Sequence, residues 1–173
     1  IVLVQGPAGH GKSTLLQQAM AACQQRGMLV GWLGMDEADN DLHRLSMHLQ
    51  VLLGELQAAA PADGARAGFP DDWDEQGSRA DGFIARLLEL KSPAALFFDD
   101  FYAVGNRTVL SFFRGLCDHL PGQVRLFIGS RTVPDIGLAR QMVNHQALVL
   151  RAEALRFTPG EVRRFFSSAQ ELE

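Results

Sequence analysis

The sequence predicts an α/β protein in which a five-stranded parallel sheet is covered by helices on both faces. Short, almost continuously apolar runs alternate with segments of helical periodicity, which is the pattern of a parallel sheet buried on both sides. Between the first such run and the first such helix, residues 6–13 (GPAGHGKS) match the phosphate-binding pattern G-x-x-x-x-G-K-[ST]. Together these two observations predict a P-loop NTPase fold.

The loop at residues 6–13 has the flanking segments that phosphate binding requires. Residues 1–4 (IVLV) suit a buried strand, and the apolar positions that follow recur at helical spacing: Leu15, Leu16, Ala19, Met20 and Cys23. A strand that turns through glycines into a helix directs backbone N–H groups at one point, where phosphate binds. The candidate nucleotide-binding residues of the loop are Gly6, Pro7, Ala8, Gly9, His10, Gly11, Lys12 and Ser13. Lys12 would reach the β- and γ-phosphates, and the Ser13 hydroxyl would ligate Mg²⁺.

The next elements continue the alternation. A second strand is expected at residues 28–34, followed by an acidic turn at 36–41 and a helix with leucines on one face. Those leucines are Leu42, Leu45, Leu49, Leu52, Leu53 and Leu56. Asp36 and Glu37 either cap that helix or face the γ-phosphate region. Residues 59–80 are rich in Ala, Pro, Gly and Asp and are expected to form an irregular insertion.

The second half of the chain follows the same pattern. Helices are expected around residues 83–88, 109–120, 136–143 and after 158, and strands at 94–98, 124–128 and 147–150. Thr158 and Glu161 are spaced as a capping box, with Pro159 at the first helical position. We therefore expect a nucleotide-binding domain over residues 1–157 and the start of a truncated helical subdomain over 158–173.

Three polar residues at strand ends complete the predicted site, because ligands of parallel sheets bind at the carboxyl ends of the strands. Asp99 and Asp100 follow an apolar strand, as in a Walker B segment. Asp99 would hold Mg²⁺, or else serve as a turn or cap carboxylate. Asp100 would orient or deprotonate the attacking water, or have no catalytic role. Arg131 would read the γ-phosphate, or pair with acidic groups as a surface arginine.

Composition narrows the function classes further. The net charge is −4 and no basic block is present, so nucleic-acid binding by this segment is not expected. Cys23 and Cys117 lie in apolar patterns and are interpreted as reduced core residues of a cytoplasmic protein. The histidines lack metal-ligand spacing, and no signal peptide or membrane-spanning run is evident. Because the chain opens inside a strand without Met, we expect a piece of a longer protein.

An ordered series of segments resembles a known family. It consists of the loop at 6–13 and residues 31–41, 97–101, 128–131 and 150–158. In this order they resemble the nucleotide-binding domain of MalT-like regulators, the large ATP-binding members of the LuxR family, which belong to the signal-transduction ATPases with numerous domains. His10 stands where that family usually has an aromatic residue such as tyrosine.

The resemblance implies a nucleotide-controlled switch. Such a domain holds ADP at rest, exchanges it for ATP with Mg²⁺, self-associates in the ATP form and hydrolyses ATP slowly. DNA binding in that family uses a C-terminal helix-turn-helix, which these residues do not include. Carried over by motif, the phosphate contacts are Gly6, Gly9, Gly11, Lys12, Ser13 and Thr14; Asp99 contacts the metal and Arg131 senses the nucleotide state.

Two other functions remain compatible with the sequence. One is a small-molecule kinase built on the same loop, which would need an acceptor pocket and an arginine-bearing lid. The other is an assembly module that binds nucleotide without hydrolysing it, since Asp100 is shorter than the glutamate usual at that position.

Overall fold

A five-stranded parallel sheet forms the centre of the molecule in the computed structural model, which describes residues 1–60, 79–156, 158–161 and 163. The strands are β1 (Val2–Gln5), β2 (Leu29–Gly34), β3 (Ala94–Asp99), β4 (Val124–Ser130) and β5 (Leu148–Leu150). Their spatial order is β2-β3-β4-β1-β5, and every pairing is parallel. The predicted sheet is confirmed, and β4 separates the strand that leads into the loop from the strand that ends at Asp99.

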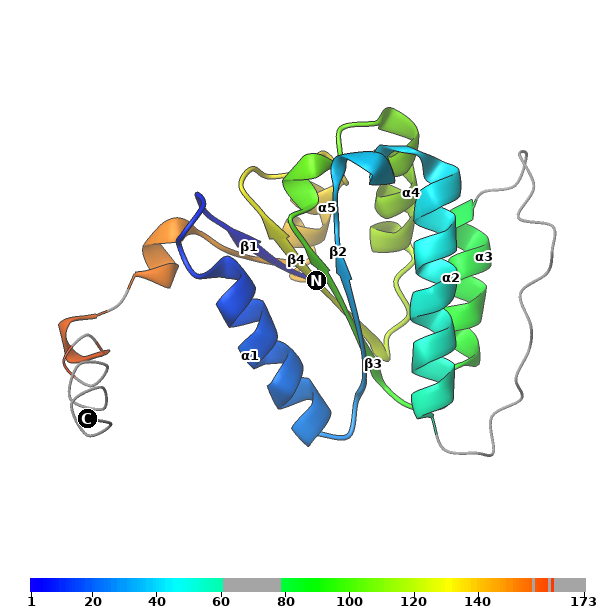
Figure 1. Ribbon diagram of the computed structural model, residues 1–173, viewed down its shortest axis with the longest axis horizontal. Coiled ribbons are helices and arrows are strands. Elements are labelled where there is room, and N and C mark those ends of the chain that lie inside the picture. Colours follow the sequence, from blue (N-terminus) through cyan, green and yellow to red (C-terminus); the bar gives the residue numbers. More distant parts are fainter. Residues whose placement is uncertain (61–78, 157, 162, 164–173) are drawn as a thin grey trace.

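Helices cover both faces of this sheet, as predicted (Figure 1). They are α1 (Lys12–Gln25), α2 (Leu42–Ala59), α3 (Arg79–Glu89), α4 (Arg107–Asp118) and α5 (Leu138–Val143). Three short 3₁₀ turns follow strands β2, β3 and β5: η1 (Glu37–Asn40), η2 (Phe101–Ala103) and η3 (Ala152–Leu155). Figure 1 shows α1 on one face and α2, α3 and α4 on the other.

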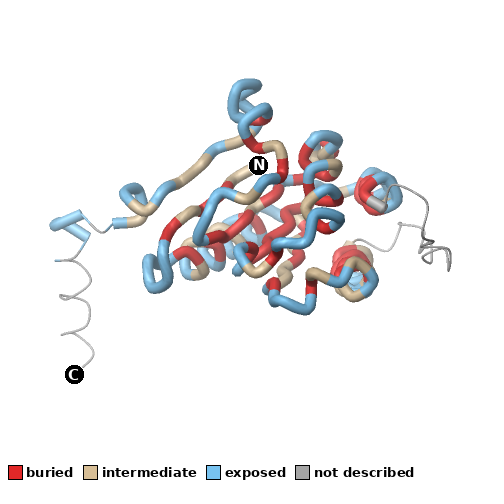
Figure 2. Tube along the Cα trace, turned by 90° about the horizontal axis from the view of Figure 1, so that it is seen from above, coloured by how far each residue is buried: buried red, intermediate tan, exposed pale blue. Residues whose placement is uncertain are grey.

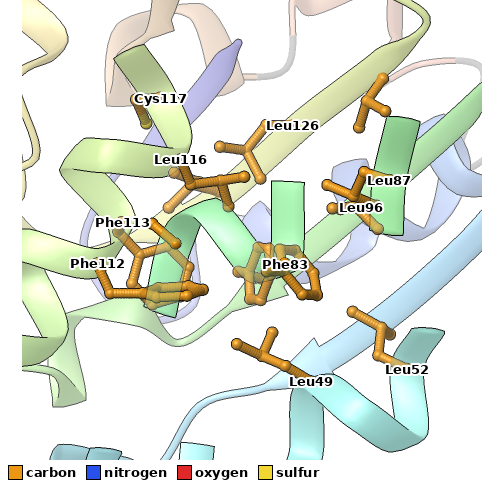
Figure 3. Packing of buried hydrophobic residues seen from close by; sticks show 14 of the residues in the cluster. Leu49, Leu52, Phe83, Leu87, Leu96, Phe112, Phe113, Leu116, Cys117 and Leu126 are labelled. Carbon is orange, nitrogen blue, oxygen red and sulfur yellow. The ribbon is translucent and has the colours of Figure 1, made fainter. Parts of the chain in front are cut away.

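The buried side chains form two clusters because successive residues of a strand point to opposite faces. In β3, Leu96 and Phe98 join the large cluster with α2 to α5, whereas Ala95 and Phe97 join a smaller cluster under α1. Figure 3 shows the large cluster, in which Phe83 lies among side chains of α2, α3 and α4. Every residue of β3 is buried, whereas β5 has no buried residue. Figure 2 shows the buried residues gathered in the middle of the molecule.

The leucine face predicted for α2 is confirmed. Leu45, Leu49, Leu52, Leu53 and Leu56 are buried, and Leu42 is partly buried against the same cluster. The helix begins where the Asp41 carboxylate accepts hydrogen bonds from the backbone N–H groups of His43 and Arg44.

The structure differs from the sequence prediction at the edges of the insertion. Ala59 ends α2, and α3 already begins at Arg79, so both flanks of the predicted irregular segment are helical. Residues 61–78 lie outside the described residues, as do Val162, Phe165 and Phe166 of the predicted last helix. Leu88 is 59% exposed, because its neighbour Leu87 takes the inward position and adjacent helical residues diverge.

The predicted capping box at the end of the chain forms. Thr158 N–H donates to Glu161 Oε2 (2.7 Å), and Glu161 N–H donates back to Thr158 Oγ1 (3.3 Å). Among the described residues, no helix is long and apolar enough to cross a bilayer.

Candidate functional site

The loop between β1 and α1 has the backbone conformation that its glycines predict. Gly9 and Gly11 both have φ of +76°, a left-handed conformation that side chains disfavour. A Cβ atom at either position would meet nothing within 4 Å, so the requirement for glycine there is conformational. The backbone beside these two glycines is therefore open to a close ligand.

Lys12 is held inside this loop. It is the first residue of α1 and only 6% exposed, and its Nζ donates a hydrogen bond to the carbonyl oxygen of Pro7 at 3.0 Å. The first backbone bond of α1 runs from Leu15 N–H to Gly11 carbonyl, so the preceding N–H groups are those that a helix start leaves without an intrahelical partner. An ammonium beside a helix N-terminus is an arrangement that attracts anions.

Asp99 reaches the same face of the sheet as α1. Its side chain is buried, and its Oδ1 accepts a hydrogen bond from Asp100 N–H at 2.9 Å. A Cβ atom on Gly129 of the neighbouring strand β4 would lie 2.4 Å from Asp99 Oδ1 and 2.7 Å from Leu16 Cδ1 of α1. The missing side chain at Gly129 therefore makes the space in which the Asp99 carboxylate extends across β4.

The predicted Mg²⁺ and phosphate ligands thus come together at one edge of the sheet. Val4 of β1 pairs with Gly129, and Gly6 N–H donates to the Ser130 carbonyl at 3.1 Å, so the loop begins beside the strand over which Asp99 lies. Carboxylate and hydroxyl oxygens such as those of Asp99 and Ser13 are ligands that Mg²⁺ accepts. The donor set fits the ion, although the described residues contain no cluster of three acidic, His or Cys side chains that would hold a metal alone.

Asp100 has an unusual backbone. Its φ is +54°, in the left-handed region, and it begins the turn η2 with its side chain exposed. The strained position lies directly after the candidate metal ligand, where strain often marks a functional turn. The exposed carboxylate can reach solvent at this edge.

Arg131 directly follows β4, and its side chain contacts a tyrosine and not an acidic group. Its Nη2 donates a hydrogen bond to Tyr102 Oη at 2.8 Å, and its guanidinium carbon lies 3.8 Å from the centre of the Tyr102 ring. Among the described residues Arg131 forms no ion pair. The alternative, in which Arg131 pairs with acidic groups at the surface, is therefore not seen among these residues, and an aromatic ring takes that place.

Asp36 caps the turn η1. Its side chain accepts from Ala38 N–H (2.8 Å), while Asp39 Oδ2 accepts from Asp36 N–H (2.8 Å), which is a reciprocal capping box. Arg44 also pairs with Asp36 at 3.1 Å. Asp36 is thus a capping residue, but of η1 and not of the following helix α2, which Asp41 caps. At the other end of the acidic turn, N–H groups of Arg44 and His43 hold the pKa of Asp41 below its ordinary value.

Asn40 joins the segments that follow β2 and β3. Its Oδ1 accepts from the N–H groups of Gly105 and Asn106, both at 2.7 Å, and its Nδ2 donates to the Ala103 carbonyl at 2.9 Å. Sequence reasoning missed both Asn40 and Tyr102. No local pattern reveals them, because each acts on a segment that is distant along the chain.

A pocket of about 600 Å³ adjoins the outer side of the loop. It lies between the loop, the first turns of α1 and the segment after β5; its lining includes His10, Thr14, Gln18, Leu155 and Arg156. A second pocket, of about 330 Å³, includes Ile1, Pro121 and Val124 and lies at the opposite edge of the sheet, where β1 and β4 begin. Of these two pockets, the first is the one next to the candidate phosphate site.

Comparisons with known proteins show which proteins the chain is similar to. No family profile matches the chain. The chain is 29% identical to the HTH-type transcriptional regulator MalT of Cronobacter sakazakii and of Klebsiella pneumoniae, and 30% identical to that of Serratia proteamaculans. Each match covers 96% of this chain but only 18% of the relative, so the chain spans less than a fifth of the length of these regulators.

A solved structure is similar in fold. It is the ORC1 protein of Aeropyrum pernix in complex with DNA, with a TM-score of 0.54, 15% sequence identity, and coverage of 98% of this chain and 43% of that chain. The predicted fold and the predicted resemblance are both confirmed: the chain has a P-loop NTPase fold and is similar, over almost its whole length, to one segment of the MalT regulators.

Proposed function

We propose that this chain binds ATP or ADP with Mg²⁺ and acts as the slowly hydrolysing switch module of a transcriptional activator. The observation that carries the proposal is the convergence of Lys12 and Asp99 on one face of one sheet edge, beside a glycine loop in left-handed conformation. The printed name of the MalT relatives supports the regulatory role, and the family resemblance of the motif series implies an adenine nucleotide.

Each part of the phosphate site has a distinct task in this proposal. Lys12 exchanges its bond to the Pro7 carbonyl for phosphate oxygens, and the N–H groups around Gly11 to Thr14 donate to the same phosphates. Ser13 and Asp99 hold Mg²⁺, which neutralises charge on the β- and γ-phosphates when bound. The remaining loop residues shape the backbone around these phosphates.

The pocket beside the loop is suited to the nucleoside. Its volume of about 600 Å³ exceeds what phosphates alone need, and its lining combines apolar side chains such as Leu15 and Leu155 with polar ones such as Gln18. A base and ribose placed there would continue outward from phosphates in the loop.

Hydrolysis is expected to be slow. Asp100 is the candidate that orients or deprotonates the attacking water, but it is short and its side chain is exposed. Slow turnover suits a switch, because the nucleotide shifts a conformational equilibrium only as far as ATP and ADP differ in affinity for the two states.

The role of the whole protein follows from its relatives and is part of the proposal. They are named HTH-type transcriptional regulators and extend well beyond this segment. We infer that DNA binding lies in a helix-turn-helix outside these residues, that the ATP form self-associates, and that the protein is cytoplasmic.

Calorimetry on the Lys12→Ala variant tests nucleotide binding. Removing the ammonium should weaken ADP binding about 10- to 100-fold, the loss expected for charge-assisted hydrogen bonds. The matched control is Lys91→Ala, which removes the other lysine of the chain at a site just before β3 begins. Unchanged ADP affinity in Lys12→Ala would contradict the proposal. Melting temperatures with ADP, ATP and GTP, each with Mg²⁺, test the choice of base.

Phosphate release separates the alternatives that share this site. Slow release of phosphate from ATP by the wild-type chain, and a still lower rate in Asp100→Asn, would support the hydrolysing switch. Nucleotide-dependent association without phosphate release would instead indicate a non-hydrolysing assembly module. Transfer of phosphate to a small acceptor would indicate a kinase.

A further inference from the structure

The contact between Arg131 and Tyr102 joins the ends of two neighbouring strands. Arg131 follows β4, and Tyr102 lies in η2, three residues beyond Asp99 at the end of β3. The guanidinium both covers the ring, at 3.8 Å from its centre, and donates to the phenol oxygen at 2.8 Å. One side chain therefore provides two separate attractions for the same cation.

This contact places the Arg131 guanidinium against the turn that follows β3, on the side of β4 opposite to the strand that leads into the loop. In the sheet order β2-β3-β4-β1-β5, β4 has β3 on one side and β1, which leads into the loop, on the other. A guanidinium resting on η2 lies on the β3 side of its own strand. A phosphate held in the loop, on the β1 side of β4, would compete with Tyr102 for the Arg131 guanidinium.

Tyr102 is well placed to act as a fixed support. The turn η2 is held by Asn40, which donates to the carbonyl of Ala103 and accepts from the N–H groups of Gly105 and Asn106. Phe101, the residue before Tyr102, is fully buried and packs against Phe113. Tyr102 itself is 39% exposed, so its contact with Arg131 is solvated and readily broken.

We propose that Tyr102 is a positioning residue that holds Arg131 in a resting position, from which the γ-phosphate of a bound nucleoside triphosphate must withdraw it. The proposal rests on the proposed nucleotide-binding function. ADP lacks the γ-phosphate and leaves the contact intact, whereas ATP competes with Tyr102 for the guanidinium. Tyr102 thereby lowers the preference of the chain for ATP over ADP.

The expected change in ATP affinity depends on how often Arg131 is free of Tyr102. If Arg131 is free for only a fraction of the time, the apparent affinity for ATP is reduced by that fraction. A solvated contact of this kind holds its partner for most of the time but not almost completely. Releasing Arg131 should therefore raise the affinity for a triphosphate by about 3- to 10-fold and leave the affinity for ADP unchanged.

The experiment measures the dissociation constants of Mg²⁺-ADP and of a non-hydrolysable Mg²⁺-ATP analogue for the 173-residue chain. Tyr102→Phe keeps the ring and removes the oxygen acceptor, and Tyr102→Leu removes both attractions. The ratio of the ADP to the analogue dissociation constant should rise in the order wild type, Tyr102→Phe, Tyr102→Leu. In the Arg131→Ala background the Tyr102 substitutions should have no effect on this ratio.

The outcomes separate this inference from the proposed function. A change that is equal for ADP and analogue, or that persists with Arg131→Ala, would indicate a merely structural role for Tyr102 and overturn the inference alone. An unchanged ratio in both Tyr102 variants, with binding that still depends on Lys12, would do the same. Nucleotide affinity that does not depend on Lys12 would overturn both.

Discussion

The two faces of the sheet are built very differently. The face under α1 has a small buried cluster, and the aromatic rings of Trp32, Phe97 and Phe127 stack along it with the outer two only partly buried. The face under α2 to α5 has the large cluster, including most of the fully buried phenylalanines: Phe83, Phe98, Phe101 and Phe113.

The candidate nucleotide site belongs to the thinly covered face. The loop, Lys12 and the pocket of about 600 Å³ all adjoin α1, and Leu155 from the pocket wall packs on the α1 cluster. Segments with few buried apolar contacts open at lower free energy than the core. The comparison therefore indicates that one face maintains the fold while the other can adjust to a ligand.

The largest expected effect tests that division directly. Phe113→Ala should lower the free energy of unfolding by about 3–5 kcal/mol, because Phe113 is fully buried and contacts Phe98, Phe101 and Phe112. The matched variant Phe127→Ala, on the α1 face, should cost about 1–2 kcal/mol, since that ring is only partly buried. Urea unfolding measures both values. Equal losses of unfolding free energy in the two variants would mean that both faces of the sheet contribute equally to stability.

The next effect concerns the space that β4 leaves for Asp99. Gly129→Ala should destabilise the chain by about 1–3 kcal/mol, because the new methyl group would overlap Asp99 Oδ1 and Leu16 Cδ1. It should also weaken Mg²⁺-dependent nucleotide binding by displacing the carboxylate. Gly34→Ala, on β2 with open space around it, is the control and should have little effect. Intact binding in a folded Gly129→Ala variant would exclude Asp99 as the metal ligand.

A smaller effect appears at alkaline pH and again differs between the faces. Burial raises the pKa of the Cys117 thiol in α4 from 9.0 to about 12, and it also raises the pKa of Cys23 in α1. Above pH 9 the unfolded chain loses the Cys117 proton while the folded chain keeps it, so stability falls as pH rises from 9 toward 12. Between pH 8 and 10 this loss is about 1.4 kcal/mol.

Chemical unfolding at both pH values measures the loss, with Cys117→Ala as the reference. The decline should be shallower by that amount in Cys117→Ala than in the wild type, and Cys23→Ala should change it less. If the free energy of unfolding falls equally in the wild type and in Cys117→Ala, groups other than Cys117 cause the loss of stability at alkaline pH.

The smallest expected effect lies at two strained turns outside either core. Asp100 and His145 have φ of +54° and +55°, conformations that glycine adopts more easily. Asp100→Gly and His145→Gly should each raise the melting temperature slightly, by the equivalent of about 0.5 kcal/mol. If the melting temperature rises in His145→Gly but falls in Asp100→Gly, the Asp100 side chain itself stabilises the folded chain.

Several features were predictable from the sequence because they depend on neighbours along the chain. The glycine loop, the leucine face of α2 and the capping box of Thr158 and Glu161 are local patterns, and each forms as predicted. The strands were found because strands buried on both faces are continuously apolar. The exact ends of the elements were less predictable, as at Arg79, where the helix α3 already begins inside the predicted insertion.

The partners of Arg131 and Asn40, and the opening at Gly129, depend on distant segments instead. Tyr102 lies 29 residues from Arg131, and Asn40 bonds residues 63 to 66 positions away. Which segment lies beside which is set by the strand order, and that order arises only when both faces of the sheet are packed. The amino-acid sequence alone therefore determined the elements and the chemistry of the loop, whereas the tertiary structure decided where Asp99 reaches and what Arg131 contacts, because those contacts exist only between strands that the folded sheet brings together.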